Sequence, residues 1–239
     1  MNDLLKLVDQ ILNEVDYKHN PYFTALMNKE FAKDDFIETQ IQFFSAVTFF
    51  SRPMAALSAK IPFPALRMEI VRNVWEEHGE GNFEKTHDKT FRELLLRLGN
   101  VQDSDIDKRA LWPEVRVFNT TLVGACVVDE YLIGVGVMGM IERMFVDISN
   151  IIGQGIVHNG WLTEDNMIHY NLHKVLDIRH SADFFNVLKP SWEESETNRY
   201  YIEQGLRMGA EVFNYLYWSM YTHRKIRIMR SVSGLHARA

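Results

Sequence analysis

The chain has 239 residues, of which 46% are hydrophobic, and it carries a net charge of −6 at neutral pH. This length and composition suffice for one large domain with a sizeable core that folds alone. The acidic balance, with no basic cluster apart from HRKIRIMR near the C-terminus, argues against a nucleic-acid-binding surface. Cys126 is the only cysteine, so a disulfide framework is excluded, which suits a reducing compartment.

The distribution of apolar residues also argues against membrane insertion. The longest uncharged apolar stretch, residues 131–141, falls well short of the roughly 20 residues that a membrane span needs. Residues 1–16 alternate apolar and charged side chains at helical spacing and lack the basic-then-apolar pattern of a signal peptide. We therefore expect a cytoplasmic protein that does not engage a membrane.

Apolar residues recur at three- and four-residue intervals along most of the chain, and strand-like alternation is hard to find. The spacing predicts helical segments over residues 4–15, 34–57, 64–75, 84–98, 114–128, 132–152, 163–180 and 198–229. Breaks such as IPFP, GEG and LKPSW separate them, and Asp34, Thr163 and Ser195 are the expected N-caps. No internal repeat or linker divides the chain, so we predict an all-α bundle of seven to eight helices in a single domain spanning residues 1–239.

Three glycines, Gly134, Gly136 and Gly139, form the GxGxxG pattern of a dinucleotide-binding turn. That turn requires a β-strand before it, whereas these glycines lie inside an apolar run that continues through MGMIERMFVDI. We interpret them as positions where two helices, or a helix and a ligand, approach closely.

Two histidines and an aspartate share the short segment NLHKVLDIRHSAD. His173, Asp177 and His180 follow one another at spacings of four and three, which places them on one face of a helix. Two imidazoles and a carboxylate suit divalent iron, manganese or zinc. The alternative interpretation is the solvated polar face of an amphipathic helix, and this stripe alone does not decide between the two.

A second group of ionisable residues lies in NVWEEHGEGNFEKTH, where Glu77 follows a helical pattern and His87 follows a glycine break. Gly79 and Gly81 permit a turn that aims both side chains inward. Glutamate is almost never buried unless it is paired, and a residue next to Glu77 points off its helix face. Four other ionisable residues of this segment are therefore expected to be exposed to solvent: Glu76, His78, Glu80 and Glu84.

Glu142 interrupts some of the least polar sequence in the chain, between YLIGVGVMGMI and MFVDISNII. A buried carboxylate must be paired or bound to a metal. Arg143 lies on another helix face, so a local salt bridge does not account for Glu142, and an ion pair to a distant cation is the alternative. With the two groups above, Glu142 completes a set of three carboxylates and three imidazoles, which suits two metal ions in a bundle core.

The pattern resembles the haem-oxygenase-like diiron oxidases and oxygenases, whose fold the CADD-, TenA- and PqqC-like proteins share. The similarity includes HNPYF before an acidic helix start, NxxxExG at residues 73–79, a histidine before LLLRLG, a glutamate after small residues, and HxxxDxxH. The resemblance implies a haem-oxygenase-like helical bundle. It also implies that the matching residues are catalytic and bind two irons: Glu77, His87, Glu142, His173, Asp177 and His180.

By this resemblance the chain is a non-haem diiron oxidase or oxygenase that cycles between Fe2+ and Fe3+ and uses O2 to oxidise a small external substrate. N-oxygenating members carry an extra carboxylate in the second core helix, whereas residues 41–68 contain no Asp or Glu. The p-aminobenzoate-forming lineage has a tyrosine and a lysine where we align Phe23 and Ile152. Oxidation of the protein's own tyrosine is therefore disfavoured, although Tyr22, one residue away, keeps that alternative open.

The segment FFSAVTFF is a candidate lining for a pocket that accepts an aromatic group. The expected substrate contacts are Phe43, Phe44, Val47, Phe50 and Arg52, the last as partner of a carboxylate. The alternative is that the phenylalanines are plain core and that the arginine lies at the surface. The preferred substrate is an aromatic, tryptophan-like amino acid, oxidised with rearrangement or C–C cleavage, because one branch of the family converts a tryptophan derivative into a nitrile.

Other interpretations stay open at this point: a fatty-acid or p-aminobenzoate-type diiron oxidase, a cofactor-free thiaminase-like or quinone-synthase-like enzyme, and a non-catalytic helical interaction protein. An imidazole that binds metal needs a partner for its second nitrogen, and His169 and Asp183 are candidates for that role. The C-terminal helix is rich in tyrosine and tryptophan, which favours a homodimer.

Overall fold

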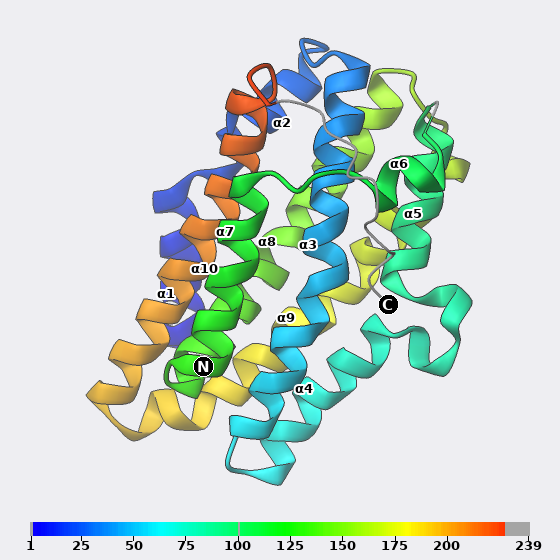
Figure 1. The fold of residues 1–239 in the computed structure, drawn as a ribbon. Helices are drawn as coiled ribbons and strands as arrows, with labels where there is room; N and C mark the ends of the chain where they lie inside the picture. The colour runs from blue at the N-terminus through cyan, green and yellow to red at the C-terminus, as the bar shows by residue number, and fades with distance from the viewer. Residues whose placement is uncertain (1, 100, 228–239) are drawn as a thin grey trace.

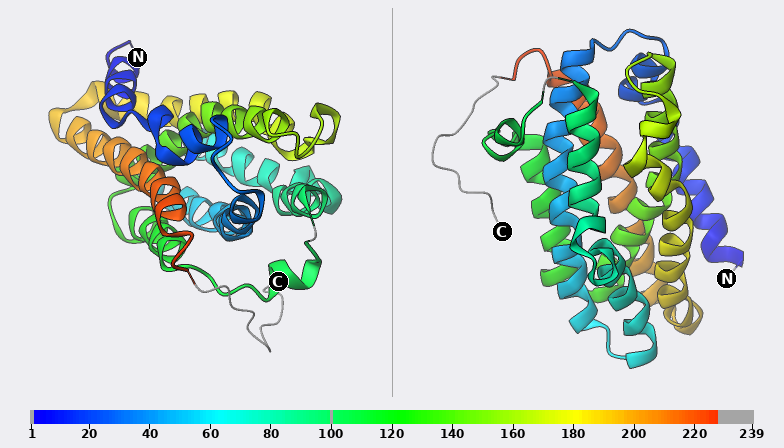
Figure 2. Two further views of the ribbon diagram at one scale, coloured as in Figure 1. Left: turned by 90° about the horizontal axis from the view of Figure 1, so that it is seen from above. Right: turned by 90° about the vertical axis from the view of Figure 1, so that its right-hand side faces the viewer.

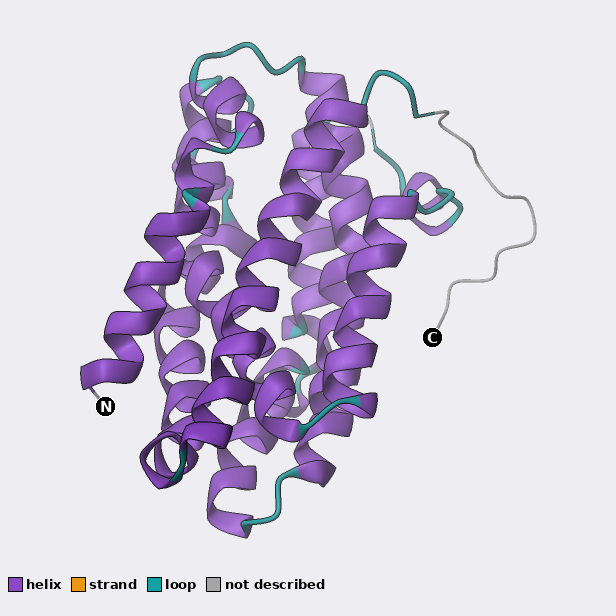
Figure 3. Ribbon diagram, turned by 90° about the vertical axis from the view of Figure 1, so that its left-hand side faces the viewer, coloured by secondary structure: helices purple, strands orange, loops and turns teal. Residues whose placement is uncertain are grey.

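The computed structural model describes residues 2–99 and 101–227, apart from the side chains of residues 2, 168, 169 and 171–178. Within these ranges the chain forms ten α-helices and no β-strand (Figure 3). The helices are α1 (Asn2–Val15), α2 (Pro21–Met27), α3 (Lys33–Lys60), α4 (Pro64–Glu77), α5 (His87–Leu98), α6 (Asp103–Asp107), α7 (Pro113–Val123), α8 (Tyr131–His158), α9 (Ile168–Glu194) and α10 (Glu196–His223).

The long helices lie side by side along the length of the bundle (Figures 1 and 2). Helix α8 runs through the middle and packs against α9 and α10, while α3 packs against α4, α5 and α7. Residues on all of these helices contribute to one continuous hydrophobic core. The mean hydropathy of α8 is the highest of the long helices, and this composition favours its position surrounded by protein along most of its length.

The all-α prediction is confirmed, but the number of helices was underestimated. The sequence pattern missed α2 and α6, which have seven and five residues. Each is too short for the three- and four-residue apolar spacing to recur over several turns. The observed α2 is instead specified by its N-terminus, where Pro21 occupies the first turn and the Asn20 side chain accepts a hydrogen bond of 3.0 Å from the Tyr22 amide.

The predicted break at LKPSW is wrong, because α9 continues through it to Glu194 with Pro190 inside the helix. Proline removes one amide donor and crowds the carbonyl four residues earlier. Phe184, Val187 and Leu188 on the preceding turns are fully buried, and α9 packs along α8. This burial outweighs the local cost of the proline, which a sequence pattern cannot show.

Of the three expected N-caps, only Ser195 is confirmed, since its hydroxyl accepts a hydrogen bond of 3.1 Å from the Asn198 amide at the start of α10. Asp34 lies in the first turn of α3, where an acid still interacts favourably with the helix dipole. Thr163 precedes a short 3-10 turn rather than α9, and its side chain makes no capping hydrogen bond.

Glycines allow α8 and α10 to cross in close contact. A Cβ added to Gly209 would lie 2.6 Å from the Val137 carbonyl oxygen, and one added to Gly205 would collide with the Ile133 carbonyl. Gly136 of α8 faces the same crossing, since a Cβ added to it would lie 3.1 Å from the Gly205 Cα atom. The GxGxxG pattern is therefore a helix-packing feature, as the sequence context indicated. None of the described helices combines the length and the apolar character needed to cross a lipid bilayer.

Candidate metal centre

The turn between α4 and α5 brings Glu77 and His87 together. Gly79, Glu80 and Gly81 have φ values of 66°, 54° and 85°, the left-handed region that glycine adopts most readily. A Cβ on Gly79 would lie 2.8 Å from the backbone carbon of Lys85, so only glycine permits the two ends of this loop to touch. The chain reverses here, and α5 begins at His87 beside the last residue of α4.

The side chains of Glu77 and His87 are both buried, and His87 Nδ1 lies 2.9 Å from Glu77 Oε2. Their burial shows that both side chains point into the protein, the orientation expected from the glycine break. An acid and an imidazole buried together must interact with each other or with a ligand, because an isolated buried carboxylate is strongly disfavoured.

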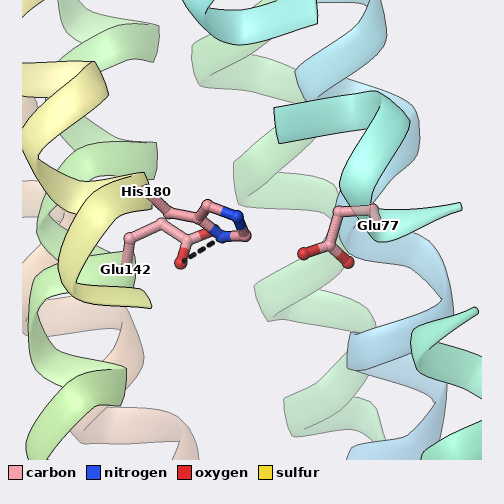
Figure 4. Close-up of side chains that lie close together, drawn as sticks. All are labelled: Glu77, Glu142 and His180. Carbon is pink, nitrogen blue, oxygen red and sulfur yellow. Dashed lines mark ion pairs between the residues drawn. The ribbon is translucent and has the colours of Figure 1, made fainter. Parts of the chain in front are cut away.

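Glu142 and His180 form the opposite side of the centre. Glu142 lies in the middle of α8 and is 4% exposed, while His180 on α9 is fully buried. His180 Nδ1 lies 3.7 Å from Glu142 Oε2 (Figure 4). Glu77 faces this pair from α4 (Figure 4). The placement explains why a carboxylate interrupts the apolar sequence of α8.

The spacing of His180 and Glu142 fits a shared metal ion, and Glu77 lies close to both. One ligand atom from each of Glu77, Glu142 and His180 lies within 4.8 Å of the other two. The separation of 3.7 Å between His180 and Glu142 is too long for a hydrogen bond. It does suit two donor atoms that share an ion, since donors about 2.1 Å from a metal lie at most about 4.2 Å apart. Imidazole and carboxylate donors together favour iron, manganese or zinc over calcium or magnesium.

A cavity of about 50 Å3 opens beside this centre, which exceeds the space needed for one water molecule. Its polar wall consists of Glu77, His87 and Glu142. The rest of the wall is apolar and comes from α3, α7, α8 and α10: Phe43, Ala46, Val47, Phe50, Phe118, Ile141, Phe145 and Phe213. The described lining includes no lysine or arginine.

Three of the five residues expected to contact substrate, Phe43, Val47 and Phe50, line this cavity. Phe44 instead packs on Phe91 and beneath the Arg92 guanidinium. Arg52 is exposed, with its guanidinium 6.0 Å from the centroid of the Phe49 ring. The geometry does not support Phe44 or Arg52 as contacts within the cavity, because both side chains lie outside its wall.

The side chains of His173 and Asp177, the two other ligands expected from the family resemblance, lie outside the described residues. The same holds for His169, which the sequence offered as a partner for an imidazole. The backbone of these three residues belongs to α9, the helix that also carries His180.

Glu76 is not the solvated acid that the sequence suggested, because it is buried, with 7% of its surface exposed. Its Oε2 atom forms a hydrogen bond of 2.7 Å with His180 Nε2 and an ion pair with the Arg179 guanidinium. The sequence did hold a signal for this role. Glu76 lies three residues and Glu77 four residues after Asn73, and both spacings place an acid beside Asn73 on the side of α4 that meets α9. His78, Glu80 and Glu84 are exposed, as expected.

Asp183 lies one turn after His180 and accepts a hydrogen bond of 3.1 Å from the Asn73 amide group. Burial raises the pKa of Asp183 above its usual value, and the hydrogen bond from Asn73 partly opposes that rise. The expectation that Asp183 is the partner of a metal-binding imidazole stays a prediction, and its described hydrogen bond ties α9 to α4.

Comparison with known proteins gives one family match. Residues 38–214 match the family described as iron-containing redox enzymes, a range that contains all six expected ligands. A search of curated proteins gives no match.

Several solved structures share the fold. A CADD-like protein of unknown function from Nostoc punctiforme is 13% identical, with a TM-score of 0.79 over 93% of this chain and 97% of the other. A domain of unknown function with a heme oxygenase-like fold from Shewanella denitrificans is 11% identical, with a TM-score of 0.72 over 94% and 91%. A TenA homologue from P. horikoshii is 14% identical, with a TM-score of 0.67 over 92% and 97%. The chain therefore has the heme oxygenase-like fold.

Proposed function

The chain belongs to the family of iron-containing redox enzymes, and from this premise we propose that it is a non-haem diiron oxidase or oxygenase that uses O2 to oxidise a small external substrate. The observation that carries the proposal is the convergence of Glu77, His87, Glu142 and His180 beside a cavity that is otherwise apolar. A centre of this kind places a redox-active ion next to a space that can hold an organic molecule.

The proposed ligands are the four converging residues together with His173 and Asp177, which follow from the family resemblance. When bound, two irons would supply the electrons that reduce O2. The carboxylates of Glu77 and Glu142 would offset the charge of the ions in a buried site. Among the described residues, no other group of three or more His, Cys, Asp or Glu side chains lies close enough together to hold a metal.

The chain's own residues would bind the substrate and exclude water. Phe145 and Phe213 line the cavity on the side of α8 and α10. The centroid of the Phe43 ring lies 5.9 Å from that of Phe145 and 6.4 Å from that of Phe213. Such a wall keeps bulk water from the reacting groups and strengthens electrostatic interactions within the site. It also holds the apolar part of a substrate beside the polar wall.

We propose an aromatic, tryptophan-like amino acid as the substrate, oxidised with rearrangement or C–C cleavage, with a nitrile as one outcome. Five phenylalanines line the cavity, and aromatic pairs gain about 0.5–1.5 kcal/mol beyond their buried area. With no lysine or arginine in the described lining, the cavity suits the aromatic body, and the ionic groups of the amino acid would lie outside it.

An external substrate also fits the position of Tyr22, the tyrosine next to Phe23 in the sequence. The Tyr22 hydroxyl is fully buried and bonded to Thr39 and Gln40, each at 2.7 Å, and Tyr22 does not line the cavity. Phe23 is buried against Tyr217.

We further propose that the enzyme acts as a homodimer, because α10 is rich in tyrosine and tryptophan.

The test is an assay of the protein loaded with Fe2+ under anaerobic conditions and then exposed to O2 with tryptophan, substituted tryptophans or fatty acids. We expect O2 consumption and a product detected by mass spectrometry with an aromatic amino acid, and neither with Glu142→Gln. Turnover of fatty acids alone would contradict the proposed substrate class. Iron that is bound but consumes no O2 with any substrate would contradict the proposed activity.

A further inference from the structure

Glu76 occupies an unusual position for an acidic residue beside a candidate metal centre. It is buried on the last turn of α4, next to Glu77, but it does not line the cavity. Its carboxylate meets the far side of the His180 ring, through the hydrogen bond of 2.7 Å between Oε2 and His180 Nε2.

The two nitrogens of His180 therefore face two different carboxylates. Nδ1 faces Glu142 across 3.7 Å, on the side of the metal centre, and Nε2 is bonded to Glu76. A neutral imidazole carries one proton, so a ring that donates from Nε2 presents the lone pair of Nδ1. An acceptor on one nitrogen in this way fixes both the tautomer and the rotation of the ring.

Two further contacts hold this arrangement in place. The Arg179 guanidinium, which is about half exposed, forms an ion pair with the same Oε2 atom of Glu76. It compensates the buried negative charge, which would otherwise be costly. One turn away, the Asn73 side chain donates a hydrogen bond to Asp183, so a second polar contact beside the Glu76–His180 contact joins α4 to α9.

We propose that Glu76 is a positioning residue for His180, holding the imidazole so that Nδ1 is presented to a metal ion between Glu77 and Glu142. The inference rests on the proposed function, because it presupposes that these residues bind metal. Glu76 acts through His180 and does not itself touch the ion.

The test is a titration of the whole protein with Co2+ under anaerobic conditions, following affinity and the ligand-field absorption bands. Glu76→Ala is expected to lower the affinity by roughly 10- to 100-fold and to shift the bands, as loss of a partner of a metal-bound imidazole does. Glu76→Gln keeps an acceptor of the same shape and is expected to lose less affinity for Co2+ than Glu76→Ala. Glu84→Gln, an exposed acid in the following loop, is the matched control and is expected to bind Co2+ as the wild type does.

The same titration in a His180→Ala background separates positioning from a structural role. If Glu76 acts through His180, Glu76→Ala causes no further loss of affinity there. Equal losses in both backgrounds, or an unchanged affinity and spectrum for Glu76→Ala and Glu76→Gln, would overturn the inference. In either case the wild type still binds Co2+, whereas a wild type that binds none would overturn the proposed function itself.

Discussion

His87 Nδ1 lies 2.9 Å from Glu77 Oε2, although a glycine-containing loop separates the two residues in sequence. The left-handed residues Gly79, Glu80 and Gly81 make this approach possible. Helices α4 and α5 thus supply one half of the candidate centre, and α8 and α9 supply the other half through Glu142 and His180. The geometry of the centre therefore depends on how these four helices pack.

Filling the cavity should reduce turnover without removing the metal. Ala46 on α3 is 2% exposed and lines the cavity but is not among the metal-binding candidates. Ala46→Leu is expected to reduce turnover by roughly tenfold or more, because a branched side chain occupies space meant for the substrate. Iron content should stay at the wild-type level. Ala55→Leu, an exposed position on the same helix, is the control, and equal effects of both variants would count against the cavity as the substrate site.

The close crossing of α8 and α10 should be intolerant of a single methyl group. Gly209→Ala places a Cβ 2.6 Å from the Val137 carbonyl oxygen, and relieving that overlap is expected to cost roughly 1–3 kcal/mol in the free energy of unfolding. Gly124→Ala is the control, because no atom lies within 4 Å of the added Cβ. Urea unfolding of both variants measures the difference, and equal stabilities would show that the helices separate without cost.

Glu114 on α7 should stabilise the fold in a pH-dependent way. Burial opposes its ionisation, but hydrogen bonds from Arg227 and His223 outweigh that effect and hold the pKa of this carboxyl below its usual 4.5. A depressed pKa in the folded state stabilises the protein above the unfolded value, and this contribution is lost as the pH falls through the folded pKa.

Glu114→Gln is therefore expected to lower the free energy of unfolding by about 1.5–3 kcal/mol at pH 7, as loss of hydrogen bonds to a charged group does. The difference from the wild type should shrink below pH 4.5. Urea unfolding at pH 7 and in acid measures it, with Glu130→Gln, an exposed position, as control. A difference that stays constant with pH would argue against the charge of Glu114 as its source.

Cys126 should be inert in the folded protein. The thiol is fully buried, and burial raises its pKa to about 12. At pH 8 the reactive thiolate is then about a thousandfold rarer than for a free cysteine. A maleimide is expected to alkylate Cys126 only after denaturant has unfolded the protein. Rapid modification of the native protein would show that the turn at Gly124–Val128, between α7 and α8, opens readily.

The sequence predicted the helical character and the candidate ligands for physical reasons that are local. Apolar spacing marks a long amphipathic helix, and Glu142 stands out because a charge inside an apolar run needs an explanation. The position of His87 followed from recognising that Gly79 and Gly81 allow a reversal of the chain. These signals require no knowledge of which helices are neighbours.

Other features depend on contacts between distant segments and could not be read locally. Pro190 stays within α9 because α8 covers the preceding turns. Glu76 is buried because Arg179 and His180, far along the chain, meet it from α9. The exposure of Arg52 likewise depends on the angle at which α3 crosses its neighbours, which apolar spacing does not fix.

The decisive measurement is the binding of Fe2+ by the purified protein under anaerobic conditions, with iron per chain determined after dialysis. About two irons per chain are expected for the wild type, as in bundle-core dimetal sites, with a marked loss in Glu142→Ala and in His180→Ala. Far fewer than two irons in the wild type, or the same iron content in both variants as in the wild type, would contradict a diiron centre at these residues.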